Sequence, residues 1–200
     1  KFMEMAVQKL IDDLTTVRDG WAEGASYRTA FTTISTEDEA KQKLAEILTG
    51  MGTLSVGELA GERMQIAFSS NSQEDEHSCF SDNTHRDIWL DAEGVSNSYY
   101  DSTLDGTDDA TARAVSGYGI DDYLADAGLT ELASDMEAAL TTTQTAYMAI
   151  DTLARAGTPF DVQIIEATSS EPAYDAIKAL NAQSSVIEDV AEALEIDAEV

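Results

Sequence analysis

The amino-acid sequence predicts an all-α fold, an antiparallel helical bundle of about four long helices plus a short helix and irregular loops. The chain has 200 residues and only 2 prolines, so long helices meet few interruptions. Apolar residues recur at three- and four-residue spacings along several segments, which is the period of an amphipathic helix. With 43% hydrophobic residues, the chain is able to build one sizeable core, so we expect a single helical-bundle domain over residues 1–200.

The first expected helix covers residues 1–22, and a loop through residues 20–33 follows it. Its apolar positions are Phe2, Met5, Ala6, Leu10, Leu14 and Val17. A second helix is expected to begin after Thr36, because Thr36 and Glu39 have the spacing of a capping box. The apolar pattern continues this helix towards Phe68.

Four glycines interrupt the second helix, and a glycine in a helix interior costs about 1 kcal/mol relative to alanine. They are Gly50, Gly52, Gly57 and Gly61. We interpret them as positions where a neighbouring helix approaches closely, because a missing side chain leaves room for it. The alternative is a bend, or a ligand that touches the backbone there.

A polar, irregular segment is expected over residues 69–82. Ser81 or Asp82 is then expected to cap a short helix that runs to about Glu93 and stops at Gly94.

The C-terminal part begins with an irregular excursion over residues 94–118. A long helix is expected over residues 120–154, with a possible interruption at Gly128, followed by a crossing segment over residues 158–168. The last helix is expected to start next to Pro172, because proline suits the first turn of a helix.

The chain is strongly acidic, with 11 basic against 39 acidic residues and a formal net charge of −28. So negative a surface repels phosphate backbones and anionic lipid headgroups, so we expect no nucleic-acid partner. No stretch approaches the ~20 apolar residues that a membrane span requires, so none is expected. Cys79 is the single cysteine, so no intrachain disulfide forms.

Both histidines of the chain, His77 and His85, lie within nine residues of each other in the acid-rich segment 73–87. Imidazole and carboxylate together are suitable ligands for iron, zinc or manganese. Asp82 and His85 are three residues apart at the expected helix start, and His77 comes from the preceding loop. The residues therefore predict a metal site of His77, Asp82 and His85. The competing interpretation is that the acids cluster only because the chain is acidic and that Asp82 is a helix cap.

Other catalytic patterns are missing from the sequence. It has no His-Glu-x-x-His, no Gly-x-Ser-x-Gly and no phosphate-binding glycine loop. Glu58 and Glu62 lie one turn apart beside Arg63, and we expect a structural ion pair there.

Two nearby strings are more specific than these patterns. Residues 57–64 read Gly-Glu-Leu-Ala-Gly-Glu-Arg-Met, and residues 73–87 read Gln-Glu-Asp-Glu-His-Ser-Cys-Phe-Ser-Asp-Asn-Thr-His-Arg-Asp. Together with residues 48–54 they make the chain resemble the imelysin-like family, in particular the C-terminal half of its iron-regulated branch.

The resemblance implies an exported protein, periplasmic or associated with the outer membrane, that is linked to iron acquisition. Members are built from two helical-bundle halves with a cleft between them, so the N-terminal half is an implied partner, and iron, another divalent metal or haem is an implied ligand. The matching strings supply the residues expected to line this cleft beside the two histidines and Asp82. They are Glu62, Glu74, Asp75, Cys79, Asn83 and Asp87.

Three functions follow as hypotheses. The first is binding of iron or an iron-containing ligand at the cleft. The second is a metallopeptidase of the insulin-cleaving type, as the family is classified. The family's Gly-x-His-x-x-Glu motif is absent from this chain, so the sequence identifies no catalytic residues. The third is a structural or partner-binding half-domain, with Phe80 and Trp89 as apolar anchors.

Overall fold

The computed structural model describes residues 1–104, 113–115, 117–166 and 170–198 of the chain. These residues fall into two compact units, an N-terminal unit (Lys1–Leu44) and a bundle unit (Ala45–Val200), each of which is described by itself. That residues 1–200 act as one domain stays a prediction.

The N-terminal unit consists of helices without a core of their own. Helix α1 (Phe2–Gly20) and helix α2 (Ser26–Thr32) contain no buried residue. Trp21 lies edge-on to Tyr27 and Phe31, with ring centroids 5.0 and 5.2 Å away. The segment 20–33, expected to be a loop, therefore holds a short helix.

Helix α3 (Glu37–Gly52) begins at the predicted capping box. The Glu39 N–H donates to the Thr36 hydroxyl at 3.2 Å, and the Glu39 carboxylate accepts from the Thr36 N–H at 3.2 Å. The capping box at this helix start is confirmed.

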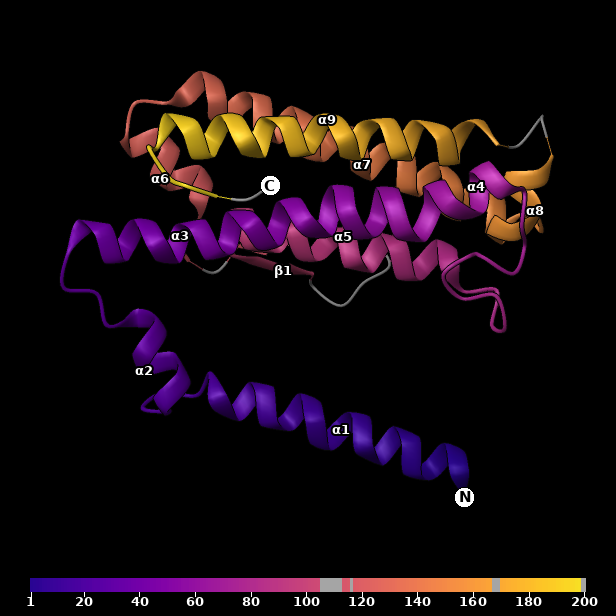
Figure 1. The fold of residues 1–200 in the computed structure, drawn as a ribbon, viewed down its shortest axis with the longest axis horizontal. Coiled ribbons are helices and arrows are strands. Elements are labelled where there is room, and N and C mark those ends of the chain that lie inside the picture. The colour runs from indigo at the N-terminus through magenta and orange to yellow at the C-terminus, as the bar shows by residue number, and fades with distance from the viewer. Residues whose placement is uncertain (105–112, 116, 167–169, 199–200) are drawn as a thin grey trace. The chain divides into compact units, whose positions relative to one another are not determined.

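The bundle unit contains four long helical stretches that are in contact around a ring. The first is the end of α3, residues 45–52, with its continuations, the π-helix η1 (Thr53–Gln65) and α4 (Ile66–Ser70). The others are α5 (Thr84–Tyr100), α7 (Thr130–Arg155) and α9 (Glu171–Ala193). Helix η1 contacts α5, α5 contacts α7, α7 contacts α9, and α9 contacts η1. Successive stretches run in opposite directions (Figure 1), so the predicted all-α, antiparallel bundle is confirmed.

Short elements connect these helices. They are β1 (Ser102–Leu104), β2 (Arg113–Val115), α6 (Ile120–Asp126) and α8 (Phe160–Ile165). The strands pair antiparallel and form a small ribbon beside α5. The predicted interruption of the long C-terminal helix is confirmed, because Gly128 has φ +78° between α6 and α7. Pro172 lies in the first turn of α9, as expected.

Helix α5 is longer than the sequence predicted. It was expected to stop at Gly94, but it continues to Tyr100 and ends at Asp101, whose φ is 43°. A Cβ at Gly94 would meet no described atom within 4 Å outside the neighbouring backbone of its own helix. The glycine is thus an ordinary helical position, and a left-handed residue seven positions later ends the helix.

The glycine-rich helix adopts a π conformation over thirteen residues, Thr53–Gln65. At its end the Ile66 N–H donates to the Gly61 carbonyl, five residues back. A Cβ at Gly50 would meet nothing within 4 Å, and one at Gly61 would meet the Val56 carbonyl oxygen of the same helix at 3.2 Å. Close approach of a neighbouring helix was therefore the wrong interpretation at both positions.

The core lies between the four helices and is mainly apolar. One buried chain of polar side chains crosses it. Gln183 on α9 donates to the Ser55 hydroxyl of η1 at 2.9 Å and accepts from the Thr143 hydroxyl of α7 at 2.8 Å. All three side chains are buried. Because each polar group has a partner, this chain fixes the register of three helices.

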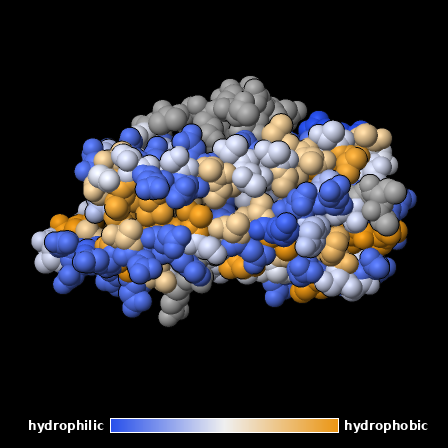
Figure 2. Space-filling view, turned by 90° about the horizontal axis from the view of Figure 1, so that it is seen from above, coloured by the Kyte–Doolittle hydropathy of each residue, from blue (hydrophilic) through white to orange (hydrophobic). Residues whose placement is uncertain are grey.

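The outer surface is mixed. Figure 2 shows hydrophilic residues over much of the face seen there, with smaller apolar areas between them. Within the described residues, no helix combines the length and the apolar character needed to cross a bilayer.

Candidate functional site

The candidate site lies where the loop 71–83 leads into α5, at the end of the bundle that also holds α4 and α8 (Figure 1). The Ser78 N–H donates to the hydroxyl of buried Thr84 at 2.9 Å, which fastens the loop to the first residue of α5. Asp82 has φ 52° and lies outside the helix, whose N-cap is Asn83. The predicted capping role of Asp82 or Ser81 is therefore wrong.

His77 and Asp87 form one side of the site. The His77 Nε2 atom lies 4.0 Å from an Asp87 carboxylate oxygen, and the two side chains are 27% and 30% exposed. Asn83 donates to the same carboxylate at 2.7 Å, and the Ser78 hydroxyl donates to it as well. We call His77, Ser78, Asn83 and Asp87 the Asp87 cluster; it is accessible to solvent.

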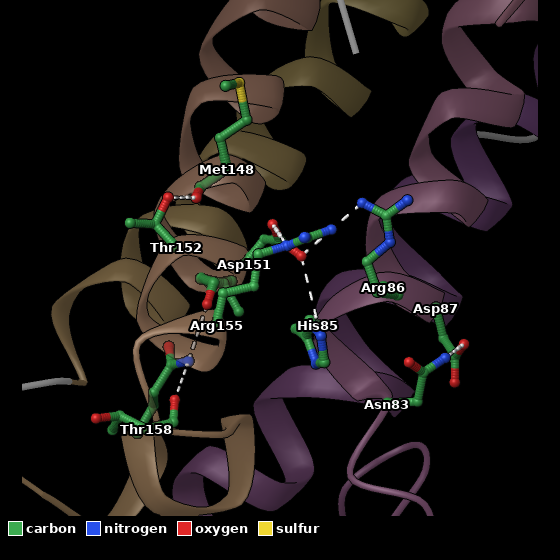
Figure 3. Close-up of polar contacts among 11 residues, drawn as sticks. Asn83, His85, Arg86, Asp87, Met148, Asp151, Thr152, Arg155 and Thr158 are labelled. Atoms are coloured by element: carbon green, nitrogen blue, oxygen red, sulfur yellow. Dashed lines mark hydrogen bonds and ion pairs between the residues drawn. The ribbon is translucent and has the colours of Figure 1, made fainter. Parts of the chain in front are cut away.

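His85 points the other way, to a carboxylate on α7. Its Nε2 atom lies 3.9 Å from Asp151 Oδ1, and a guanidinium nitrogen of Arg86 is also 3.9 Å from that oxygen. The Arg155 Nε atom donates to Asp151 Oδ2 at 2.7 Å. Figure 3 shows His85 and Arg86 directed at Asp151, with Asn83 and Asp87 on the other side of α5. We call His85, Arg86, Asp151 and Arg155 the Asp151 cluster.

The Asp151 cluster gathers two of the chain's few arginines around one carboxylate. One carboxylate, 9% exposed, is shared by two guanidinium groups and an imidazole. Arginine is always charged in proteins, so the cluster carries at least one net positive charge. The Arg86 guanidinium also lies over the Trp89 ring, 4.6 Å from its centroid, which holds its direction.

The two nitrogen atoms of the His85 ring have different surroundings, and only Nε2 faces the Asp151 carboxylate. The Nδ1 atom is buried and has no hydrogen-bond partner among the described residues. At 3.9 Å the contact with Asp151 is longer than a hydrogen bond, so the carboxylate is an electrostatic neighbour of the ring.

Glu76 is a buried acid beside these clusters, and in the part of the chain that the structure describes, one of its carboxylate oxygens has no hydrogen-bond partner. Burial raises the pKa of the Glu76 carboxyl above its ordinary value of 4.5; Asp161 and Asp82 raise it further, while the hydrogen bond with Thr84 lowers it. The carboxyl therefore holds a proton more strongly than an exposed glutamate does.

The remaining predicted residues are spread over the neighbouring surface. Glu62 on η1 and Glu74 in the loop are exposed, and Cys79 is partly buried. Asp75 is exposed and accepts a hydrogen bond from the Ser70 hydroxyl at 3.1 Å.

Two further predictions are settled by the structure. The expected ion pair on the glycine-rich helix is confirmed, with Arg63 2.7 Å from Glu58. Of the two expected apolar anchors, Phe80 is fully exposed, whereas Trp89 is buried and is therefore not a surface anchor.

The structure thus joins Asn83 and Asp87 with His77, and places His85 with a different acid. In the described parts of the chain, no group of three or more His, Cys, Asp and Glu side chains is placed to hold a metal ion. The set of His77, Asp82 and His85 as metal ligands stays a prediction.

Sequence reasoning missed Asp151 and Arg155, although one signal pointed to them. Tyr147, Ile150 and Asp151 are all buried on the same face of α7. A single acid on an otherwise apolar helix face, followed four residues later by an arginine, indicates a buried ion pair.

The fold and the site together define a class of protein, an antiparallel helical bundle with paired imidazoles and carboxylates at one end. Residues 1–187 match the sequence model of the Imelysin family, which is named as a peptidase family. The chain therefore belongs to the imelysin family. The comparison with curated proteins found no match.

Proposed function

We propose that this imelysin-family chain is an exported binding protein of iron acquisition, and that it takes iron as a compound such as haem or a chelate rather than as a bare ion. The observation that supports this proposal most is His85. Its Nε2 atom faces Asp151, and among the described residues its buried Nδ1 atom has no hydrogen-bond partner. A ring nitrogen without a partner is a donor that an iron compound can use once the ring turns towards it.

The number of available donors favours an iron compound. A bare divalent ion needs about four to six ligands, whereas haem iron or chelated iron needs only one or two from the protein. Among the residues that the structure describes, no three His, Cys, Asp or Glu side chains gather for an ion. One imidazole at each cluster is sufficient for a ligand that brings its own donors.

The other parts of the ligand surface are proposed on the same basis. His77, whose Nε2 atom lies 4.0 Å from Asp87, is the more exposed of the two imidazoles, at 27% against 17%. The exposed acids Glu62, Glu74 and Asp75 surround the approach to the loop. A second helical half, as the family resemblance implies, would close the cleft over this face, and location in the periplasm or at the outer membrane belongs to the same proposal.

We do not propose peptide hydrolysis for this chain. A metallopeptidase activates water on a metal that usually has three protein ligands and a nearby general base. The described part of the chain holds no such ligand group, and the Gly-x-His-x-x-Glu motif is absent from the sequence.

The test is a titration of the full chain with haem, with ferric citrate and with ferrous ion, followed by absorbance and calorimetry. We expect haem or the chelate to bind and His85→Ala to weaken binding about tenfold or more. Asp12→Ala on α1 is the matched control, because Asp12 is exposed and far along the chain from either histidine. Unchanged binding of all three forms by the His77→Ala/His85→Ala variant would overturn the proposal.

A further inference from the structure

The bundle unit has a hollow where α5 ends and α7 begins, with α6 beside it. Its volume is about 330 Å³, at the lower end of the range for small-molecule sites, so it suits a ligand of only a few non-hydrogen atoms. Tyr99 in this hollow and His85 are about 20 Å apart along α5. The hollow is therefore separate from the two histidine clusters.

Acidic and aromatic side chains line the hollow. Asp121 and Glu137 supply two carboxylates. Tyr99 and Tyr100 supply two rings, with centroids 4.8 Å apart and planes at 79°. Among the described residues that line it, there is no Lys, Arg or His. Tyr99 is buried and Glu137 is exposed, so the hollow extends from the surface to the Tyr99 ring.

The turn before α6 fixes the position of Asp121. A Cβ at Gly119 would lie 2.2 Å from Asp121 Oδ1 and 2.6 Å from the Tyr99 carbonyl oxygen, so only glycine fits there. The Asp121 Oδ1 atom is buried, and no described residue donates a hydrogen bond to it. A buried carboxylate oxygen without a donor is costly, and a ligand with N–H groups would remove this cost.

The carboxylates make the hollow electrostatically negative. Burial raises the pKa of the Asp121 carboxyl above its ordinary value of 3.8; backbone hydrogen bonds lower it, and the charges of Asp122 and Glu137 raise it. Burial also raises the pKa of the Tyr99 hydroxyl, and Asp121 and Glu137 contribute to that shift. A positive charge in the hollow would relieve the repulsion between these groups.

The polar groups of the hollow accept hydrogen bonds rather than donate them. The Tyr99 hydroxyl donates its proton to the Ala133 carbonyl at 3.3 Å, which leaves its lone pairs as acceptors beside the carboxylates. A primary ammonium group has three N–H donors and no acceptor, and a cation is attracted to tyrosine rings. A metal ion fits less well, because no three His, Cys, Asp or Glu side chains gather for one in the described parts of the chain.

We propose that this hollow binds a small organic ammonium ion, with the ammonium group at Asp121 and Glu137 and its carbon chain against Tyr99 and Tyr100. The inference does not depend on iron binding, because it uses neither histidine.

The experiment is an NMR titration of the full chain with n-butylammonium chloride at about 0.15 M salt, followed at the backbone amides around Tyr99 and Asp121. We expect saturable shifts with a Kd of about 1 mM. The neutral compound 1-butanol should give about a tenth of the shift or less. Asp121→Asn/Glu137→Gln should raise the Kd about tenfold or more, because both charged acceptors are lost. Glu137→Gln alone changes an exposed residue, keeps the fold and should raise the Kd about threefold.

The matched control is Glu131→Gln/Asp135→Asn, which removes two charges from exposed positions of α7 outside the hollow. It should leave the Kd within about twofold. If both double variants weaken binding equally, the amine is attracted only by the acidic surface, and the proposal is wrong. Shifts of equal size with 1-butanol, or no saturation below about 20 mM amine, would also overturn it.

Discussion

Asp151→Asn is expected to destabilise the protein, although it removes an acid from a chain with a net charge of −28. Relief of self-repulsion should make the loss of an acid neutral or slightly stabilising. At Asp151, however, the carboxylate neutralises two arginines and faces His85. The sign of the change in the free energy of unfolding therefore distinguishes a buried clamp between α5 and α7 from an ordinary acidic residue.

The magnitude follows from how deeply each partner is buried. Removing one partner of a fully buried ion pair costs about 3–5 kcal/mol. The side chain of Asp151 is 9% exposed and those of His85 and Arg86 are 17% and 22% exposed, but Arg155 is 52% exposed and stays solvated without its partner. Discounting the Arg155 contact for solvent screening leaves about 2–3 kcal/mol.

Urea unfolding at pH 7 measures this loss. With a slope of about 2 kcal/mol per molar urea, the midpoint should fall by about 1–1.5 M. Glu37→Gln is the matched control, because it also removes one acid that has a basic partner. The Glu37 carboxylate lies 3.6 Å from the Lys41 ammonium group, but the Glu37 side chain is 84% exposed, so its loss should cost little. If Asp151→Asn and Glu37→Gln unfold at the same midpoint, the Asp151 cluster does not hold α5 to α7.

Three further changes follow from the described contacts. Gln183→Ala should lower the free energy of unfolding by about 2–4 kcal/mol in urea melts, because it removes two buried hydrogen bonds and opens a cavity, while the Ser55 and Thr143 hydroxyls keep their backbone acceptors; a loss below about 1 kcal/mol would contradict this. Glu76→Gln should stabilise the protein at pH 7. Since the folded-state pKa of Glu76 is raised, stability falls as pH increases from the ordinary value of 4.5 through the folded-state pKa, and this part of the pH profile of Tm should vanish in the variant. Gly50→Ala should stabilise by up to about 1 kcal/mol, whereas Gly61→Ala should gain less because its Cβ meets a carbonyl oxygen at 3.2 Å; equal melting temperatures of the two variants would refute the distinction.

The helices themselves were predictable because their signals are local. The capping box at Thr36, the break at Gly128 and the start at Pro172 depend on residues close in sequence, and all three are confirmed. The end of α5 was missed because an isolated glycine resembles a stop. Gly94 occupies open space in mid-helix, and Asp101 takes the left-handed conformation instead.

The π conformation of η1 was not predictable from spacing alone. The pattern of apolar residues and glycines does not distinguish a π-helix from an α-helix, and long π segments are rare. The sequence showed only that four glycines in one helix carry a cost in stability and need a structural reason. The structure supplies it at Gly61, where the carbonyl five residues back leaves little room for a side chain.

The sequence singled out the two histidines and their neighbouring acids, but it did not predict the partner of His85. The acids that are neighbours of His85 in sequence suggested its partners, yet its nearest carboxylate belongs to Asp151, 66 positions later. Side chains on a helix three or four residues apart share a face, but which face meets another helix depends on the packing of the whole bundle. In the sequence, the only sign of the contact between His85 and Asp151 is that Asp151 lies on the apolar face of α7.

Basic residues are scarce in the bundle unit, and the Asp151 cluster holds two of them. Residues 45–200 contain five basic side chains (Arg63, Arg86, Arg113, Arg155 and Lys178) against 31 of the chain's 39 acids, since eight acids precede residue 45. Two of these five contact the same carboxylate. Because two arginines share Asp151 with His85, replacing the imidazole with alanine leaves the carboxylate neutralised, whereas Asp151→Asn removes the carboxylate that both guanidinium groups share. Stability should therefore respond more to Asp151→Asn than to His85→Ala, and binding of an iron compound should respond more to His85→Ala.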